Sequence, residues 1–273
     1  MGAVRAFASA AAALGIWAAA DGEPAHAQDM MRGVDLSSPD MTMSEMSRAD
    51  VEALLAKGRP RDFSAKRLSG LDLSGLDLSG VNLRAARLNG ADLAGANLDG
   101  ATLDQAWALK ADFAGASLKG AHLFGTQLQG ADLSKADLSG ARIAGDLSTA
   151  KLVGAKLVGA DGSADEKNQS MGLMRAVFKS ADLSSADLRG ANLDRADLEF
   201  AKLKGADLTG ASLREAEAEG ADLRGARLDG ANLTGLDVDS ARIDAGAAPL
   251  FATAKNAGRV LKERPSRTDA KRS

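Results

Sequence analysis

Carboxylates are the most abundant side chains in this sequence that could act as acids, bases or metal ligands. Asp and Glu together number 37, whereas the chain has two histidines and no cysteine. Without cysteine, neither a disulfide nor a thiolate nucleophile can form. The sequence also lacks a phosphate-binding glycine loop and a histidine-rich metal motif, so we expect no cofactor, no metal and no enzymatic activity.

The carboxylates follow a regular spacing and do not gather in one segment. Asp72, Asp92, Asp112 and Asp132 recur at a constant interval, which predicts a row on one exposed face without a pocket to shift their pKa values. His122 is the only histidine beyond residue 27, and a lone histidine at an outward position is more often solvated than catalytic. The formal net charge of −3 does not suggest a nucleic-acid-binding domain.

The segments that carry these residues repeat every five positions. Residues 91–95 read Ala-Asp-Leu-Ala-Gly and residues 96–100 read Ala-Asn-Leu-Asp-Gly, and the same frame covers 63–143 and 178–243. In an α-helix a five-residue step turns by about 140°, so the leucines would form no apolar stripe. In a long strand an odd period would move every second leucine to the opposite face.

One arrangement satisfies this period. Each pentad is a three-residue extended piece, with Ala and Leu inward and Asp or Asn outward, followed by a two-residue corner that is often Ser-Gly, Asp-Gly or Arg-Gly. Successive corners wind the chain into coils that stack about 4.8 Å apart through parallel backbone hydrogen bonds. Leucine then stacks on leucine in a dry core, so the sequence predicts an all-β solenoid.

The pentads resemble the A-(D/N)-L-x-x motif of pentapeptide-repeat proteins over about residues 61–243. This resemblance implies a right-handed quadrilateral parallel β-helix, with four pentads in each coil. The motif is highly specific for the fold and nearly silent on activity. Some members of the family protect or inhibit DNA gyrase, because an acidic β-helix resembles duplex DNA in width and charge.

The beginning of the chain has the features of a secretion signal. Arg5 supplies a positive charge, residues 6–20 form an uncharged alanine-rich run, and residues 25–27 read Ala-His-Ala, a small-x-small cleavage site. The apolar run is short for a membrane span. We expect residues 1–27 to be a signal peptide, cleaved after Ala27, and the mature protein to be periplasmic or secreted.

The segments next to the repeats predict a linker and a cap. Residues 28–46 have no apolar period and predict a flexible linker. Residues 47–58 predict a short helix, with Ser47 as its N-cap and Asp50 at its third position. Because the end of a solenoid exposes unpaired backbone and core side chains, we expect this helix to cap the first coil.

Residues 244–273 follow the last repeat and predict a C-terminal helix with a polar, basic tail. Leu250, Ala254, Ala257 and Leu261 would share one face of that helix. The helix is interpreted either as a C-terminal cap or as the contact of a homodimer.

The repeat has two irregularities, one within its first block, 61–162, and one between that block and the second block, 176–243. One pentad lacks a residue near Ala144, and the period then fails over residues 163–175. We interpret the first feature as a shortened corner and the second as an inserted loop that leaves the coil.

Four residues are candidate partner contacts. Met171, Leu173 and Met174 in the inserted loop either fold back over a face of the solenoid or contact a partner. Trp107 should point outward, beside Ala108, where the usual central leucine is missing. It either covers that thin spot in the core or anchors a partner.

Two functions fit these features. The first is a non-enzymatic structural or protein-interaction scaffold that presents flat faces to an unknown protein partner, without contact to nucleic acid or to a membrane beyond the signal peptide. The alternative is a DNA mimic that binds DNA gyrase. Interleaved cations such as Arg189, Arg195, Arg224 and Arg227 weaken the negative field that a mimic needs, and export would separate the protein from gyrase. The sequence favours the scaffold.

Export predicts a new N-terminus at Gln28 in the protein isolated from its native host, measured by mass spectrometry of the intact chain. Recovery of the chain from the cytoplasm with Met1 in place would contradict export. An N-terminus at Met30 or Met31 would instead indicate that the start codon is misassigned.

Overall fold

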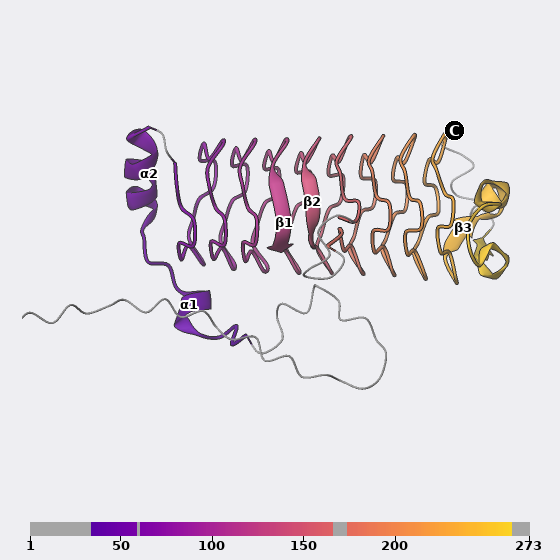
Figure 1. Cartoon of the computed structure of the whole chain (residues 1–273), viewed down its shortest axis with the longest axis horizontal. Helices are drawn as coiled ribbons and strands as arrows, with labels where there is room; N and C mark the ends of the chain where they lie inside the picture. Colours follow the sequence, from indigo (N-terminus) through magenta and orange to yellow (C-terminus); the bar gives the residue numbers. More distant parts are fainter. Residues whose placement is uncertain (1–33, 59–60, 166–173, 264–273) are drawn as a thin grey trace, which may run out of the picture.

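The computed structural model describes residues 34–58, 61–165 and 174–263. The described chain forms a long rod of stacked coils, with α2 at one end and β3 at the other (Figure 1). The predicted signal peptide, residues 1–27, and the basic tail beyond residue 263 lie outside the described residues.

The coils stack through parallel pairing at a constant offset. Asp72 pairs with Asp92, and Asp92 with Asp112, so each coil contains four pentads. The hydrogen bonds run in both directions: Leu93 N–H donates to the Asp112 carbonyl at 2.6 Å, and Asp92 N–H donates to the Leu71 carbonyl at 3.0 Å. The structure is therefore a parallel β-helix, as the five-residue period predicts.

The interior of the rod is a continuous apolar stack. The inward alanine and leucine of each pentad, such as Ala91 and Leu93, are fully buried, and one cluster extends from Val51 to Val260. Each buried leucine contributes about 1.5–3 kcal/mol relative to an exposed one. The two pentads without a central large residue, at Ala108 and Ala218, still place that alanine in the buried core.

The outward Asp and Asn residues have a structural role at the corners. The Asp92 carboxylate accepts a hydrogen bond from the Ala94 N–H at 2.9 Å, and Asp112 accepts one from the Ala114 N–H at 2.8 Å. These bonds form an Asx turn that starts the corner. The second corner residue has a left-handed backbone, with φ of +64° at Gly95, which explains the frequent glycine there.

The missing residue near Ala144 is visible as a change of register. Strands β1 (His122–Gln127) and β2 (Arg142–Asp146) are parallel, and the pairing shifts between Phe124 and Gln127. The offset between coils then falls by one position, as in the pairing of Asp132 with Lys151. Gly145 is required at this point, because an added Cβ would lie 2.5 Å from the Thr126 carbonyl oxygen. The predicted shortened corner is confirmed.

The pairing confirms an insertion before Val177, and residues 166–173 of the predicted loop lie outside the described residues. Asp146 pairs with Val177, which is a far larger offset than in a regular coil, and Val177 then pairs with Asp197 at the regular one. The Asp165 N–H donates to the Met174 carbonyl at 2.8 Å and joins the two arms of the insertion at its base. The coils on both sides of the insertion remain paired, as Asp146 pairs with Val177 and Asp161 with Asn192.

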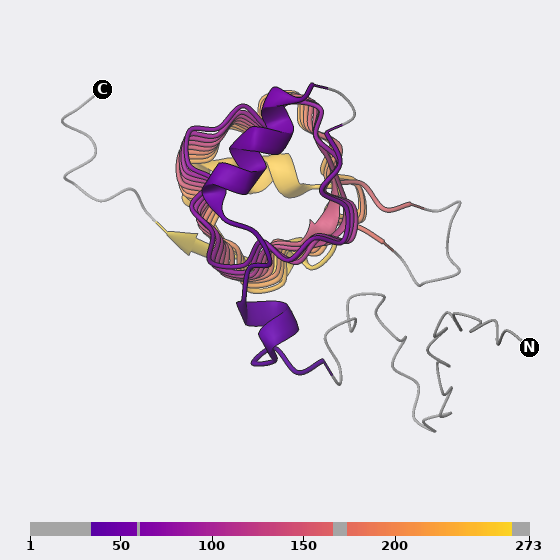
Figure 2. The same cartoon turned by 90° about the vertical axis from the view of Figure 1, so that its left-hand side faces the viewer.

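The N-terminal end of the rod is capped by α2 (Arg48–Ala56), which crosses the open end of the first coil (Figure 2). Ser47 is the N-cap and forms a capping box with Asp50, as predicted. Val51 is buried against the core, and Arg48 pairs with Asp72 at 2.9 Å.

The flexible linker predicted over residues 28–46 is wrong for its described part. Residues 34–46 contain α1 (Pro39–Thr42), which buries Met41, and Ser44 forms an antiparallel bridge with Leu68. Asp40 and Glu45 both pair with Arg67. The segment has no period in its sequence that would predict this structure, because contacts with the folded coil hold it in place.

The predicted C-terminal helix is wrong as well. The chain forms two 3-10 helices, η2 (Ala245–Phe251) and η3 (Ala257–Arg259), followed by β4 (Leu261–Glu263). Strand β4 pairs in parallel with β3 (Arg242–Asp244) and extends the ladder of the last coil. Pairing with that unpaired edge competes successfully against a weak helix that contains Pro249 and Gly258.

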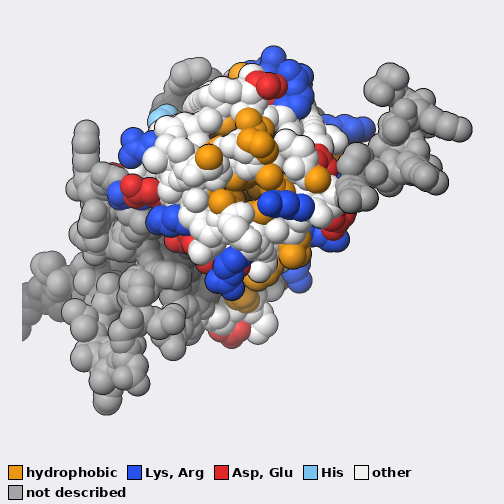
Figure 3. Space-filling model, turned by 90° about the vertical axis from the view of Figure 1, so that its right-hand side faces the viewer, with side chains coloured by type: hydrophobic (Ala, Val, Ile, Leu, Met, Phe, Trp, Pro, Cys, Tyr) orange, Lys and Arg blue, Asp and Glu red, His pale blue; other side chains and the backbone are white. Residues whose placement is uncertain are grey.

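The C-terminal end carries exposed apolar side chains. Phe251 is buried and covers the last core residues, whereas Leu250 and Leu261 are each 53% exposed. Apolar side chains gather in a band across this end of the rod (Figure 3). The helix that would have carried a homodimer contact does not form. Among the described residues, no helix has the length and hydrophobicity needed to cross a membrane.

Leu133→Asp should lower the free energy of unfolding by about 4 kcal/mol or more, because it buries an unpaired carboxylate in the stacked core. Asp132→Ser, on the outside of the same pentad, should change it by less than about 1 kcal/mol, since a serine hydroxyl can also accept the hydrogen bond from the Ser134 N–H. Thermal unfolding measures both. Equal losses would show that the inward and outward faces are reversed.

Candidate functional site

One face of the rod brings together the features that the sequence singles out. We call it the Trp107 face. Its outward residues are joined by successive backbone pairings and are Arg67, Arg87, Trp107, Gln127, Asp146, Val177, Asp197, Glu217, Asp237 and Lys255. The inserted loop rejoins the coil immediately before Val177, on this face. The row begins with two arginines and is mostly acidic towards its C-terminal end.

Trp107 lies at an outward position, paired with Arg87 on one side and Gln127 on the other. Its side chain is half-buried, and the adjacent Ala108 and the central residue of the next pentad, Phe113, are fully buried. The core therefore remains buried at the pentad that lacks a leucine, although Trp107 itself is only half-buried. Part of the indole remains available to a partner, and the prediction of a partner contact stays a prediction.

Met174 is the described member of the three apolar loop residues, because Met171 and Leu173 lie outside the described residues. Met174 is only 3% exposed. Its terminal methyl lies 3.5 Å from where a Cβ would stand on Gly125, at the corner beside the Trp107 face. Burial of Met174 against the coil favours the covering interpretation for this residue, and a partner contact by the rest of the loop stays a prediction.

Arg175 fastens the insertion to the acidic end of the Trp107 face. Its guanidinium donates two hydrogen bonds to the Glu217 carboxylate, at 2.8 and 2.6 Å, and one to the Arg195 carbonyl at 3.0 Å. Its side chain is 11% exposed. Burial alone would lower the pKa of Arg175, but the hydrogen bond and charge of Glu217 raise it overall.

Three carboxylates, on Asp197, Glu199 and Glu217, lie within 4.8 Å of one another. Protein cations already balance this group, because Arg175 contacts Glu217 and lies 3.8 Å from Asp197, and Lys179 pairs with Glu199. Burial raises the pKa of Asp197, and the neighbouring charges of Glu199 and Glu217 raise it further. The arrangement acts as an ionic network that fixes the loop and the coils, and sequence reasoning missed it because the repeat period does not place Arg175.

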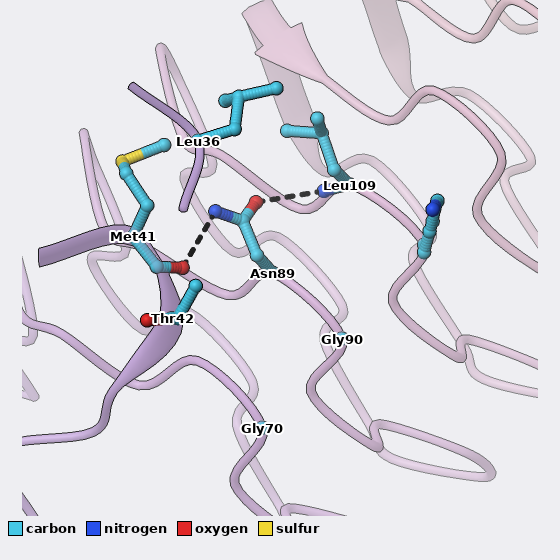
Figure 4. Close-up of a pocket in the computed structure, with 8 residues that line it drawn as sticks. Leu36, Met41, Thr42, Gly70, Asn89, Gly90 and Leu109 are labelled. Carbon is cyan, nitrogen blue, oxygen red and sulfur yellow. Dashed lines mark hydrogen bonds between the residues drawn. The ribbon is translucent and has the colours of Figure 1, made fainter. Parts of the chain in front are cut away.

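A pocket of about 330 Å³ lies between the N-terminal segment, residues 34–46, and the corners of the rod beside it. Leu36 and Met41 of the segment and Leu109 of the corner give it a largely apolar wall (Figure 4). Asn89 joins the two sides: its amide donates to the Met41 carbonyl at 3.0 Å, and its oxygen accepts from the Leu109 N–H at 3.0 Å. No motif in the sequence indicates this pocket, because residues 28–46 were expected to be a linker.

The remaining candidates from the sequence are placed as expected. His122 is exposed at an outward position, between Thr102 and Arg142 in the ladder. The aspartate row from Asp72 to Asp132 stacks coil on coil on one face. At the two ends of the row, Asp72 pairs with Arg48 and Asp132 pairs with Lys151.

A family model described as pentapeptide repeats matches the chain in eight copies, over residues 67–106, 110–143, 173–210 and 206–243. The chain has no match among curated protein sequences.

Solved structures that resemble the chain include QnrB1 and HetL. Full-length QnrB1, a plasmid-mediated fluoroquinolone resistance protein, is 17% identical, with 75% of this chain and 93% of that chain covered and a TM-score of 0.47. HetL, a pentapeptide repeat protein involved in heterocyst differentiation regulation from the cyanobacterium Nostoc sp. strain PCC 7120, is 29% identical, with 73% and 81% covered and a TM-score of 0.33.

Asp197→Asn should raise the melting temperature at pH 7, by roughly 1–3 °C. Because burial raises the pKa of Asp197 in the folded chain, its ionised form destabilises the fold above that pKa. The destabilisation disappears as the pH falls to the ordinary aspartate value of 3.8. The gain of the variant should therefore vanish near pH 3.

Asp187→Asn is the matched control, because a hydrogen bond from Arg189 lowers the pKa of Asp187 in the folded chain. Its ionised form stabilises the fold above the ordinary aspartate pKa, so this variant should melt lower than the parent at pH 7. A lower melting temperature for Asp197→Asn at pH 7 would show that Arg175 outweighs the burial of Asp197.

Proposed function

Because the chain belongs to the pentapeptide-repeat family, we propose that it is a non-enzymatic protein-interaction scaffold. In this proposal the rod is a right-handed, four-sided β-helix whose flat faces bind a protein partner. The pairing of each pentad with the fourth pentad after it, and the left-handed residue that ends each corner, support the four-sided cross-section.

The observation that carries this proposal is the separation between the residues that fold the chain and those that face outward. Inward Ala and Leu residues, with the backbone ladder, run the length of the rod. The outward positions accept Asp, Arg, Trp, Thr and His within the same geometry. A rigid frame with freely variable outer side chains is suited to protein recognition, because little conformational entropy is lost when a partner binds.

Export to the periplasm or the medium is part of the proposal and rests on sequence features alone. Those features are Arg5, the apolar run over 6–20 and the Ala-His-Ala site at 25–27. An exported scaffold without cysteine is insensitive to the redox state of its compartment.

The alternative function, a DNA mimic that binds gyrase, has one observation in its favour. The C-terminal half of the Trp107 face carries Asp197, Glu217 and Asp237 in one row. Against it, outward carboxylates elsewhere pair with cations of the next coil, as Asp182 does with Lys202 and Asp207 with Arg227. Such pairs cancel the continuous negative field that would imitate a DNA backbone.

The scaffold predicts a partner whose capture depends on one outer face. The mature chain, immobilised and exposed to periplasmic extract of its native host, should retain a partner, and Trp107→Ala should reduce the retained amount about tenfold or more. His122→Ala, an exposed outward residue on the neighbouring face, serves as the control and should change little. Quantitative mass spectrometry measures the retained protein.

Two outcomes would contradict the scaffold. One is a set of retained proteins that is unchanged by single substitutions on each of the outer faces in turn. The other is inhibition of purified DNA gyrase in a supercoiling assay by near-stoichiometric amounts of the chain, which would favour the DNA mimic.

A further inference from the structure

Phe200 is the most exposed aromatic side chain that the structure describes on the rod, at 57%. It is the second residue of the corner that follows Asp197 on the Trp107 face. Its ring lies over the next coil, because a Cβ added to Gly220 would stand 2.5 Å from the ring carbon Cδ1. The Cδ1–Cε1 edge of the ring therefore lies against Gly220, and more than half of the side chain remains exposed to solvent.

The fold itself does not need a phenylalanine at this corner. Phe200 has a left-handed backbone with φ of +55°, which is unfavourable for a bulky residue. Other coils place small or polar residues at the same corner position, namely Gly70, Gly90, Lys110, Gly130, Thr149, Ser180, Gly220 and Ser240. An exposed ring also contributes little to the core, so its value lies in what it presents to solvent.

Two acidic residues, Glu199 and Glu219, are neighbours of Phe200, whose N–H donates to the Glu219 carbonyl at 2.8 Å. Glu199 precedes Phe200 in the chain, and Glu219 takes the equivalent corner position one coil further on. Burial raises the pKa of Glu219, and the charges of Asp237 and Glu199 raise it further. Glu199 pairs with Lys179, but among the residues that the structure describes no cation pairs with Glu219. The corner therefore combines an exposed aromatic ring with a carboxylate that no described cation pairs with.

The same end of the face already binds a guanidinium. Arg175 lies among Asp197, Glu199 and Glu217, with two hydrogen bonds to Glu217 and little exposed surface. This arrangement shows the chemistry that the acidic end accepts: a planar cation that makes paired hydrogen bonds to a carboxylate. Glu219, one corner away, offers a carboxylate of the same kind without such a partner.

We propose that the corner formed by Phe200 and Glu219 binds an arginine side chain from a basic segment of a partner protein. The guanidinium would stack on the exposed Phe200 ring and pair with Glu219. Arginine is favoured over lysine because its planar group can stack and make two hydrogen bonds at once. The inference rests on the proposed scaffold function and identifies one surface and the chemistry of its partner.

A fluorescein-labelled nona-arginine peptide is the probe, and fluorescence anisotropy at low salt measures its binding to the full chain. Phe200→Ser and Glu219→Gln should each weaken binding about three- to fivefold. A nona-lysine peptide should bind the parent chain more weakly than nona-arginine. Serine occupies the same corner position at Ser180 and Ser240, so Phe200→Ser should fold with an undiminished melting temperature.

Two matched variants control for general effects of charge and hydrophobicity. Asp229→Asn removes one charge at a different corner, where the Asp229 side chain is 79% exposed. Val153→Ser removes an apolar side chain that is 42% exposed at another corner. Both should leave peptide binding unchanged. Equal weakening by these controls, or no weakening by Phe200→Ser, overturns the proposed site.

Two further measurements separate this inference from its alternatives. A full-length variant with Arg264, Arg267, Lys271 and Arg272 all changed to Gln should bind the peptide as the parent does. Much tighter binding by that variant would show that the chain's own basic end occupies the corner, which overturns a partner segment as the occupant. If the scaffold partner from periplasmic extract is retained equally by Phe200→Ser, the scaffold stands and this site fails.

Discussion

Parallel hydrogen bonding between coils at a fixed offset is the constraint on which the rest of this structure depends. Each inward leucine donates its N–H to the next coil, while each outward residue donates to the previous one. The leucines can stack only if each coil contains a whole number of pentads, and a coil of four pentads meets that condition. An added or missing residue must therefore be compensated within one coil. Otherwise every later side chain would point to the opposite side of the backbone.

The two irregularities show how the rod absorbs such changes. The missing residue is absorbed by a bulge between β1 and β2, where Gly145 permits a close approach of two backbones. After the insertion the coil resumes at Val177, which pairs with Asp197 in the regular register. Arg175 then fixes the returning arm to Glu217, so the ionic network of the Trp107 face follows from the insertion and not from the repeat.

The inside and the outside of the rod have different roles. The inside of the rod is uniform and carries the stability, and the corners are set by Asx turns and left-handed residues. The outer surface is therefore free to differ from coil to coil, and the Trp107 face changes from basic to acidic along its length. Departures from the repeat, such as Trp107, Arg175 and Phe200, are where specific recognition can be encoded.

The sequence by itself determined the period, the inward and outward assignment, the N-terminal cap, the shortened corner and the place of the insertion. All of these can be read from short stretches of sequence, because each pentad sets its own backbone conformation and the neighbouring pentads repeat that conformation. The structured N-terminal segment, the C-terminal strand β4 and the network around Arg175 were decided by tertiary contacts. In each case residues that are distant in the chain meet only after the coils have stacked, and no period in the sequence records such a contact.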